Sequence, residues 1–135
     1  MFLLDTNVVS ELRRVKPHGA VAAWLATLES SDFCLSAVTA GEIQQGVERT
    51  RIHDVMKALE IEAWLVEYLA STLVIPVDAE IFRTWAQLMY GRQQHLAMDA
   101  MIAATAIRRG LTLATRNVND FQQFPVTIFD PFSYR

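Results

Sequence analysis

The stretch Ala97–Ala114, with the sequence AMDAMIAATAIRRGLTLA, decides the fold. Residues 97–109 are rich in alanine and predict a helix, and Gly110 stands where a glycine commonly ends one. The apolar residues Leu111–Ala114 follow at once and predict a strand. Parallel strands need a helical crossover between them, so a helix that runs directly into a strand favours a parallel sheet.

Four other short apolar runs predict strands: Phe2–Leu4, Phe33–Leu35, Leu73–Val77 and Val126–Phe129. Pro76 predicts an edge position for the third of these, because a proline cannot donate to a neighbouring strand. Between the strands, apolar residues recur at helical spacing before Leu12, over Ala20–Glu29, from Thr39, over Val55–Ala70 and after Asp78. Strands that alternate with helices predict one α/β domain, residues 1–135, with a central parallel sheet of about five strands covered by helices on both faces.

Composition indicates an ordinary globular protein of 135 residues, 52% hydrophobic and 20% charged. The net charge of −3 argues against a general nucleic-acid-binding surface. The basic residues nevertheless cluster, at Arg13, Arg14 and Lys16, at Arg49 and Arg51, and at Arg108 and Arg109. A local basic rim around an acidic centre is compatible with both observations.

Nothing in the sequence suggests a membrane segment, because the apolar runs are too short to span a bilayer. No basic region precedes the first strand, so we expect no signal peptide. Cys34 is the only cysteine, which excludes a disulfide framework and favours a reducing compartment. We therefore expect a cytoplasmic protein.

Acidic residues follow several of the predicted strands. Asp5 comes directly after the first strand, Glu42 follows the second, and Asp120 follows the fourth. Asp99 begins the helix that leads to the fourth strand, so its end of the helix should face the same edge of the sheet. Ligands of open parallel sheets bind at the carboxyl ends of the strands, near the point where the strand order reverses. The four acids would meet there if the first and fourth strands were neighbours.

Carboxylates that converge in this way repel one another unless a cation neutralises them. Mg²⁺ or Mn²⁺ suits an all-oxygen ligand set. Each acid also has a simpler interpretation as a helix cap, and Thr39–Glu42 fits a capping box. Asp78 serves as an internal control, because it also follows a strand and caps a helix but belongs to the predicted edge.

Other chemistries find little support. His18, His53 and His95 are scattered, without the spacing of a zinc site. The sequence contains no glycine-rich phosphate loop and no G-x-S-x-G motif for a serine hydrolase.

The segments 1–7, 36–46, 99–106 and 115–121 together resemble the PIN-domain family, specifically its VapC-like toxins and their FitB-type relatives. The resemblance implies a Mg²⁺- or Mn²⁺-dependent endoribonuclease in which Asp5 and Asp99 bind the metal, with Glu42 close by. Asp120 matches the variable fourth acid, while Asn117 stands where some relatives carry an acid. The resemblance also implies a toxin homodimer, a VapB-like antitoxin that inserts a segment into the toxin's groove, and operator DNA contacted only through that antitoxin.

We therefore expect a toxin that hydrolyses RNA phosphodiester bonds, with Asp5, Glu42, Asp99 and Asp120 as catalytic and metal-binding residues. Thr6, Thr115 and Asn117 would hydrogen-bond the substrate phosphate or the acids. Three alternatives stay open: a FitB-type, DNA-associated regulator with weak nuclease activity, a metal-dependent phosphatase, and acids that serve only as helix caps.

Overall fold

The computed structural model describes all residues, 1–135. Strands and helices alternate along the chain as predicted. The strands are β1 (Phe2–Leu4), β2 (Phe33–Ser36), β3 (Val74–Ile75), β4 (Thr112–Ala114) and β5 (Ile128–Phe129). The α-helices are α1 (Thr6–Leu12), α2 (Gly19–Leu25), α3 (Ala37–Arg51), α4 (Val55–Ser71), α5 (Ala79–Met89), α6 (Ala97–Arg109) and α7 (Val118–Phe121).

The five strands form one parallel sheet in the order β3-β2-β1-β4-β5. Phe2 is in register with Phe33 on one side and with Thr112 on the other. The first and fourth strands are therefore neighbours, which is the condition for the acids to meet, and the predicted edge position of the strand that precedes Pro76 is confirmed. The strand order reverses beside β1, so the carboxyl ends of β1 and β4 form the position where such sheets bind ligands.

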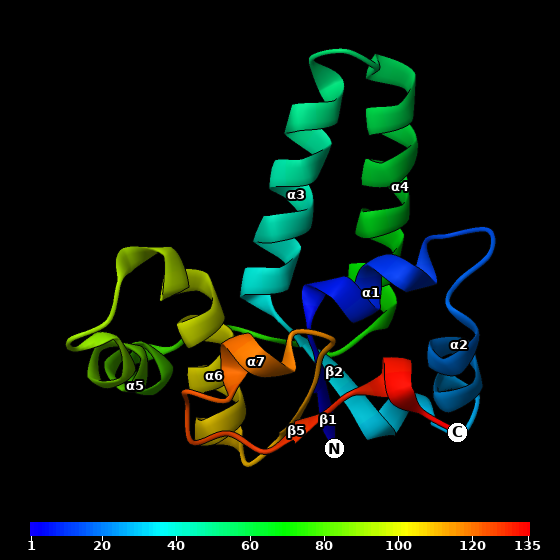
Figure 1. Cartoon of the computed structure of the whole chain (residues 1–135). Helices are drawn as coiled ribbons and strands as arrows, with labels where there is room; N and C mark the ends of the chain where they lie inside the picture. The colour runs from blue at the N-terminus through cyan, green and yellow to red at the C-terminus, as the bar shows by residue number, and fades with distance from the viewer.

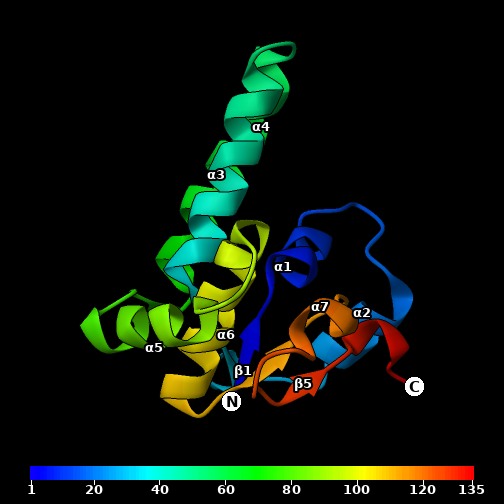
Figure 2. The ribbon, with the colours of Figure 1, turned by 60° about the vertical axis from the view of Figure 1, so that its left-hand side comes forward.

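Alternate residues of the central strands point to opposite faces of the sheet, and each face has its own hydrophobic cluster. Leu3 and Leu113 pack with α6 and α7, while Leu4 and Leu35 pack with α1 and α2. Figure 2 shows α5 and α6 on one side of β1 and α1 and α2 on the other. The prediction of helices on both faces is confirmed.

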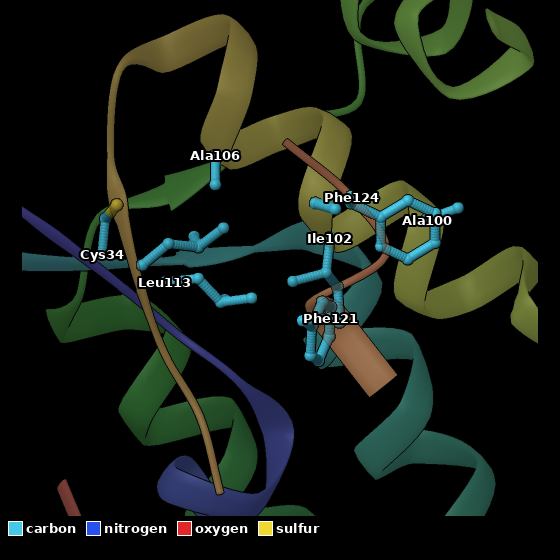
Figure 3. Packing of buried hydrophobic residues seen from close by; sticks show 9 residues of the cluster. Cys34, Ala100, Ile102, Ala106, Leu113, Phe121 and Phe124 are labelled. Atoms are coloured by element: carbon cyan, nitrogen blue, oxygen red, sulfur yellow. The ribbon is translucent and has the colours of Figure 1, made fainter. Parts of the chain in front are cut away.

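The cluster under α6 explains why this helix is rich in alanine. Ala100, Ala103 and Ala106 are completely buried and let the helix approach the sheet closely. In Figure 3 the side chains of Ile102, Leu113 and Phe121 fill the space between α6, the sheet and α7. Tight packing of α6 against the sheet places its first turn, with Asp99, at a defined position.

The structure corrects some boundaries. The helix predicted for 20–29 ends at Leu25, where the chain continues into a 3₁₀ turn, Ser30–Asp32. The third and fifth strands are shorter than predicted, because only 74–75 and 128–129 pair with a neighbouring strand. Such ends depend on partners across the sheet, which a local pattern does not reveal.

Helices α3 and α4 form an antiparallel hairpin that stands away from the rest of the molecule (Figure 1). Arg51 near the end of α3 pairs with Glu48 and, across the hairpin, with Glu62 of α4. None of the helices is both long enough and apolar enough to cross a bilayer.

Candidate active site

Asp5 lies at the carboxyl end of β1, where the backbone N–H of Asp5 donates to the carbonyl of Ala114 on β4 (2.9 Å). Its side chain caps α1, because Oδ1 accepts from the backbone N–H of Thr6 (2.8 Å). The residue is only 4% exposed. Burial raises the pKa of Asp5 and the charge of Glu42 adds to this, while hydrogen bonds from Thr115, Thr6 and Asn7 act in the opposite direction.

Two side chains hold the other oxygen of Asp5. The hydroxyl of Thr115, which is wholly buried, donates to Oδ2 (2.7 Å), and the amide of Asn7 donates to the same atom (3.1 Å). Thr115 in turn accepts from the backbone N–H of Asn117 (3.0 Å). The loops after β1 and β4 are thus joined at Asp5, and this carboxylate has one defined orientation.

Glu42 reaches the same region from α3. The hydroxyl of Thr6 donates to Glu42 Oε1 (2.7 Å) and lies 3.2 Å from the hydroxyl oxygen of Thr39. The predicted capping box at Thr39–Glu42 is wrong, because α3 begins at Ala37 and its N-cap is Ser36, whose hydroxyl accepts from the N–H of Val38. Glu42 therefore has no capping role, and its charge contributes to the raised pKa of Asp5.

Asp99 lies in the first turn of α6, as predicted. Its pKa is raised to about 6, first by burial and then by the negative charges of Asp5, Asp120 and Glu42, while the charge of His95 acts in the opposite direction. Only nearby charges have this effect, so the four acids share one region at the end of the sheet. Asp120, in the first turn of α7, is the most exposed of them.

No positively charged side chain forms a salt bridge with any of the four acids. Asp78, the internal control, behaves differently: it caps α5 and forms a salt bridge with Arg109. Its pKa is lowered, mainly by the hydrogen bond from the N–H of Ile81. The negative charge of Asp78 is thus neutralised by an arginine, whereas none of the four acids at the end of the sheet forms a salt bridge.

The acids do not form a closed ligand shell, since no three Asp, Glu, His or Cys side chains converge on one point that an ion could occupy. Like charges hold carboxylates apart, and Asp5 and Glu42 are turned toward hydroxyl and amide donors. In donor chemistry the set fits a hard divalent cation, because every candidate ligand is a carboxylate oxygen and none of the four acids is engaged in a salt bridge.

The predicted substrate-binding residues divide into two groups. Thr6 and Thr115 hydrogen-bond the acids, and Thr115 is too deeply buried to touch a substrate directly. Asn117 is exposed at the mouth of the site. Next to it Arg116 is held at the surface with its guanidinium 4.6 Å from the centre of the Phe132 ring.

Two residues of the site were missed by the sequence reasoning. Asn7 bridges Asp5 and the loop after β4, where its Oδ1 accepts from the N–H of Arg116 (3.3 Å). Thr39 is wholly buried beside Thr6. Its place three residues before Glu42, on the same side of one helix, is the signal that could have indicated it.

The model of the PIN domain family matches residues 2–126. The chain belongs to the PIN-domain family. It is 34% identical to Toxin FitB of Neisseria gonorrhoeae, over 98% of this chain and 99% of that protein. It is 32% identical to VapC ribonuclease Y4jK of Sinorhizobium fredii, over 98% of each chain.

Solved structures agree with this PIN-domain assignment. The crystal structure of FitAcB from Neisseria gonorrhoeae superposes with a TM-score of 0.82 at 34% identity, covering 98% of this chain and 99% of the other. The structure of FitAB bound to an IR36 DNA fragment superposes with a TM-score of 0.72 at 31% identity, covering 100% of this chain and 98% of the other. The crystal structure of DNA-bound VapBC from Salmonella typhimurium superposes with a TM-score of 0.77 at 25% identity, covering 96% of this chain and 97% of the other. The family resemblance inferred from the sequence segments is confirmed.

Proposed function

We propose that this PIN-domain protein is the toxin of a VapBC-type pair, a divalent-metal-dependent endoribonuclease that hydrolyses RNA phosphodiester bonds. The observation that supports this most directly is the unneutralised group of Asp5, Glu42, Asp99 and Asp120 at the carboxyl ends of β1 and β4. The pKa of Asp99 is raised by burial and, after that, by the charges of the other three acids. A relative of nearly equal length is named a VapC ribonuclease.

In this proposal Asp5 and Asp99 bind Mg²⁺ or Mn²⁺, and Glu42 and Asp120 complete or orient the shell. When bound, the ion supplies the positive charge that polarises the scissile phosphate. Thr115 and Asn7 hold Asp5 in place, and Thr6 holds Glu42, so the acids are positioned before substrate arrives. Asn117 is exposed and accessible to the phosphate of the substrate.

The partners follow from the solved relatives, which are toxin–antitoxin complexes, some of them bound to DNA. The partner of this chain is a VapB-like antitoxin, and operator DNA is contacted through that antitoxin. We also propose a homodimer in the cytoplasm. Several large apolar side chains on the surface are available for such contacts, among them Met56 and Val66 of α4 and Phe82 of α5.

The deciding experiment compares Asp5→Asn with the matched control Asp78→Asn. Both substitutions remove one carboxylate charge from a helix cap, but only Asp5 belongs to the acid group. With RNA and Mn²⁺, we expect the rate of cleavage to fall more than about 100-fold in Asp5→Asn, beyond the usual effect of removing an outer-shell partner. The control should retain the parent rate. Full activity of Asp5→Asn would overturn the proposal.

A second candidate is a DNA-associated regulator that cleaves RNA weakly, which the DNA-bound FitAB relative favours. Expression of the toxin without its antitoxin distinguishes the two functions. Growth arrest that disappears in Asp5→Asn supports the nuclease, whereas operator binding without growth arrest supports the regulator. Hydrolysis of a small phosphoester without RNA cleavage would instead indicate a phosphatase.

A further inference from the structure

The basic clusters of the sequence divide sharply in the folded protein. Arg14 pairs with Glu11, Arg51 with Glu48 and Glu62, Arg108 with Glu80, and Arg109 with Asp78. Arg13 and Arg49 are exposed and form no salt bridge. Arg14, Arg51, Arg108 and Arg109 are thus neutralised within the protein, whereas the guanidinium groups of Arg13 and Arg49 remain available to an external anion.

Arg13 and Arg49 line the same groove, although one follows α1 and the other lies on α3. The groove has a volume of about 280 Å³ and lies between α1, α3 and α4. Its polar lining consists of Thr6, Ser10, Arg13, Glu42, Arg49 and Thr50. Helix α1 packs against α3, and both views place it beside the base of the α3–α4 hairpin (Figures 1 and 2).

The groove is continuous with the acid group, because Glu42 belongs to both and Thr6, which also lines the groove, donates a hydrogen bond to Glu42. Glu42 is the only acid among its lining residues, so the two arginines make the groove locally positive in a chain whose net charge is −3. Gly46 contributes to its shape: a Cβ at this position would lie 3.9 Å from Nη2 of Arg49. A larger side chain there would occupy space that the guanidinium now borders.

We propose that this groove, which we name the arginine groove, binds the phosphate backbone of single-stranded RNA beside the scissile bond. Arg13 and Arg49 each contact a backbone phosphate there. The inference rests on the proposed nuclease function and adds the path of the substrate to it. A guanidinium binds phosphate through charge-assisted hydrogen bonds, and the hydroxyl of Ser10 in the same lining is a further donor for backbone oxygens.

Salt dependence of RNA binding tests the proposal directly. The double variant Arg13→Ala/Arg49→Ala is made in the Asp5→Asn background, and a fluorescent single-stranded oligoribonucleotide of mixed sequence is titrated at several salt concentrations. Each phosphate contact contributes about 0.7 to the slope of log K against log[salt] for single strands, so the slope should fall by about 1.4. Binding at low salt should weaken roughly three- to tenfold.

Two further variants distinguish a specific effect of the arginine groove from a general effect of the protein's positive charge. Arg83→Ala removes an exposed arginine of α5 that lies outside the groove and should leave the slope unchanged. Arg13→Lys/Arg49→Lys keeps the charge and should restore most of the slope. In the protein with Asp5 intact, the alanine pair should raise KM for RNA cleavage with Mn²⁺ while kcat changes little. Thermal unfolding of each variant verifies that it is folded.

The possible failures are distinguishable. If the parent protein cleaves RNA but the alanine pair has the slope and KM of Arg83→Ala, the arginine groove is not the RNA path and the inference is overturned. If that pair instead weakens only the antitoxin complex, the groove is a protein-binding site, which also overturns it. If RNA binds with the expected slope but is never cleaved, the proposed nuclease function fails while the groove stands.

Discussion

Asp5 is held by three donors, the N–H of Thr6, the hydroxyl of Thr115 and the amide of Asn7. A buried carboxylate with this many partners has little freedom to rotate. It costs free energy to keep it charged, which is why its pKa is raised despite the hydrogen bonds. The hydrogen bonds fix the position of the Asp5 carboxylate although its burial costs the protein stability, as expected of a group that must be ready to bind a ligand.

Substituting Thr115 tests this positioning role. Thr115→Val keeps the shape of a buried side chain but removes the hydroxyl that donates to Asp5. RNA cleavage should fall about 10- to 100-fold, the usual effect of losing a group that orients a metal ligand. Thr105→Val is the matched control, because Thr105 is equally buried but its hydroxyl bonds only to the carbonyl of Met101 in its own helix. Equal losses in both variants would point to packing rather than positioning.

The raised pKa of Asp99 predicts a pH dependence of stability in the presence of a chelator. The carboxyl of Asp99 has a pKa of about 6 in the folded protein against 3.8 for the ordinary group. Between these pH values the folded state binds more protons than the unfolded state, so the free energy of unfolding falls as the pH rises from about 4 to about 6. Asp5 contributes in the same direction.

Asp99→Asn should therefore unfold at a higher temperature than the parent at pH 7, and at nearly the same temperature at pH 4. Scanning calorimetry with a chelator at the two pH values measures this difference. A difference of the same size at both pH values would show that Asp99 does not titrate in this range.

At the scale of elements, α6 connects the core to the site. Its buried alanines fix its distance from the sheet, and its first turn carries Asp99. The helix ends at Gly110, which has φ +66 and ψ 38 and so occupies the left-handed region that favours glycine. The N–H of Leu111 then donates to the carbonyl of Ala106 (2.8 Å), and the chain turns directly into β4.

Replacing this glycine should destabilise the turn. Gly110→Ala meets no neighbouring atom within 4 Å, so its effect isolates the backbone conformation, and we expect a loss of about 1–2 kcal/mol in the free energy of unfolding. Gly41→Ala, within α3 and equally free of neighbours, should instead gain about 1 kcal/mol, because alanine favours the helix. Urea denaturation of both variants measures the two effects. Changes of the same sign would refute the conformational explanation.

For the molecule as a whole, the acid group places negative charge that the protein itself does not neutralise at one end of the sheet. Acids such as Asp78 and Glu62 form salt bridges elsewhere, so the concentration is local and not a consequence of the net charge. A divalent ion bound only by the folded state would stabilise it by mass action. The proposed metal dependence can therefore be tested without any RNA.

Thermal unfolding with increasing Mn²⁺ should show a rising midpoint. At a concentration 100-fold above Kd the stabilisation should reach about 2.7 kcal/mol. Asp5→Asn should lose most of this gain, whereas Asp78→Asn should keep it. An equal response of both variants would mean that the ion binds elsewhere.

The amino-acid sequence by itself determined the order of strands and helices, the edge position beside Pro76 and the acids that follow β1, β2 and β4. These features depend on local patterns: apolar periodicity, a glycine at a helix end and polar residues at strand ends. The sequence left open the strand order that brings β1 beside β4, and the fold decided it.

Tertiary structure alone decided which groups meet. It placed Thr39 beside Thr6, and it gave Glu42 a hydrogen bond from Thr6 in place of a capping box. It also left Arg13 and Arg49 unpaired, while Arg14 and Arg51 form salt bridges with acids. Hydrogen bonds and ion pairs between residues far apart in the chain depend on the packing of whole elements and on the rotamer each side chain adopts there. Local sequence patterns carry no information about the packing of elements or about rotamers. The sequence could therefore suggest which residues belong to the candidate site, but not which contacts they make.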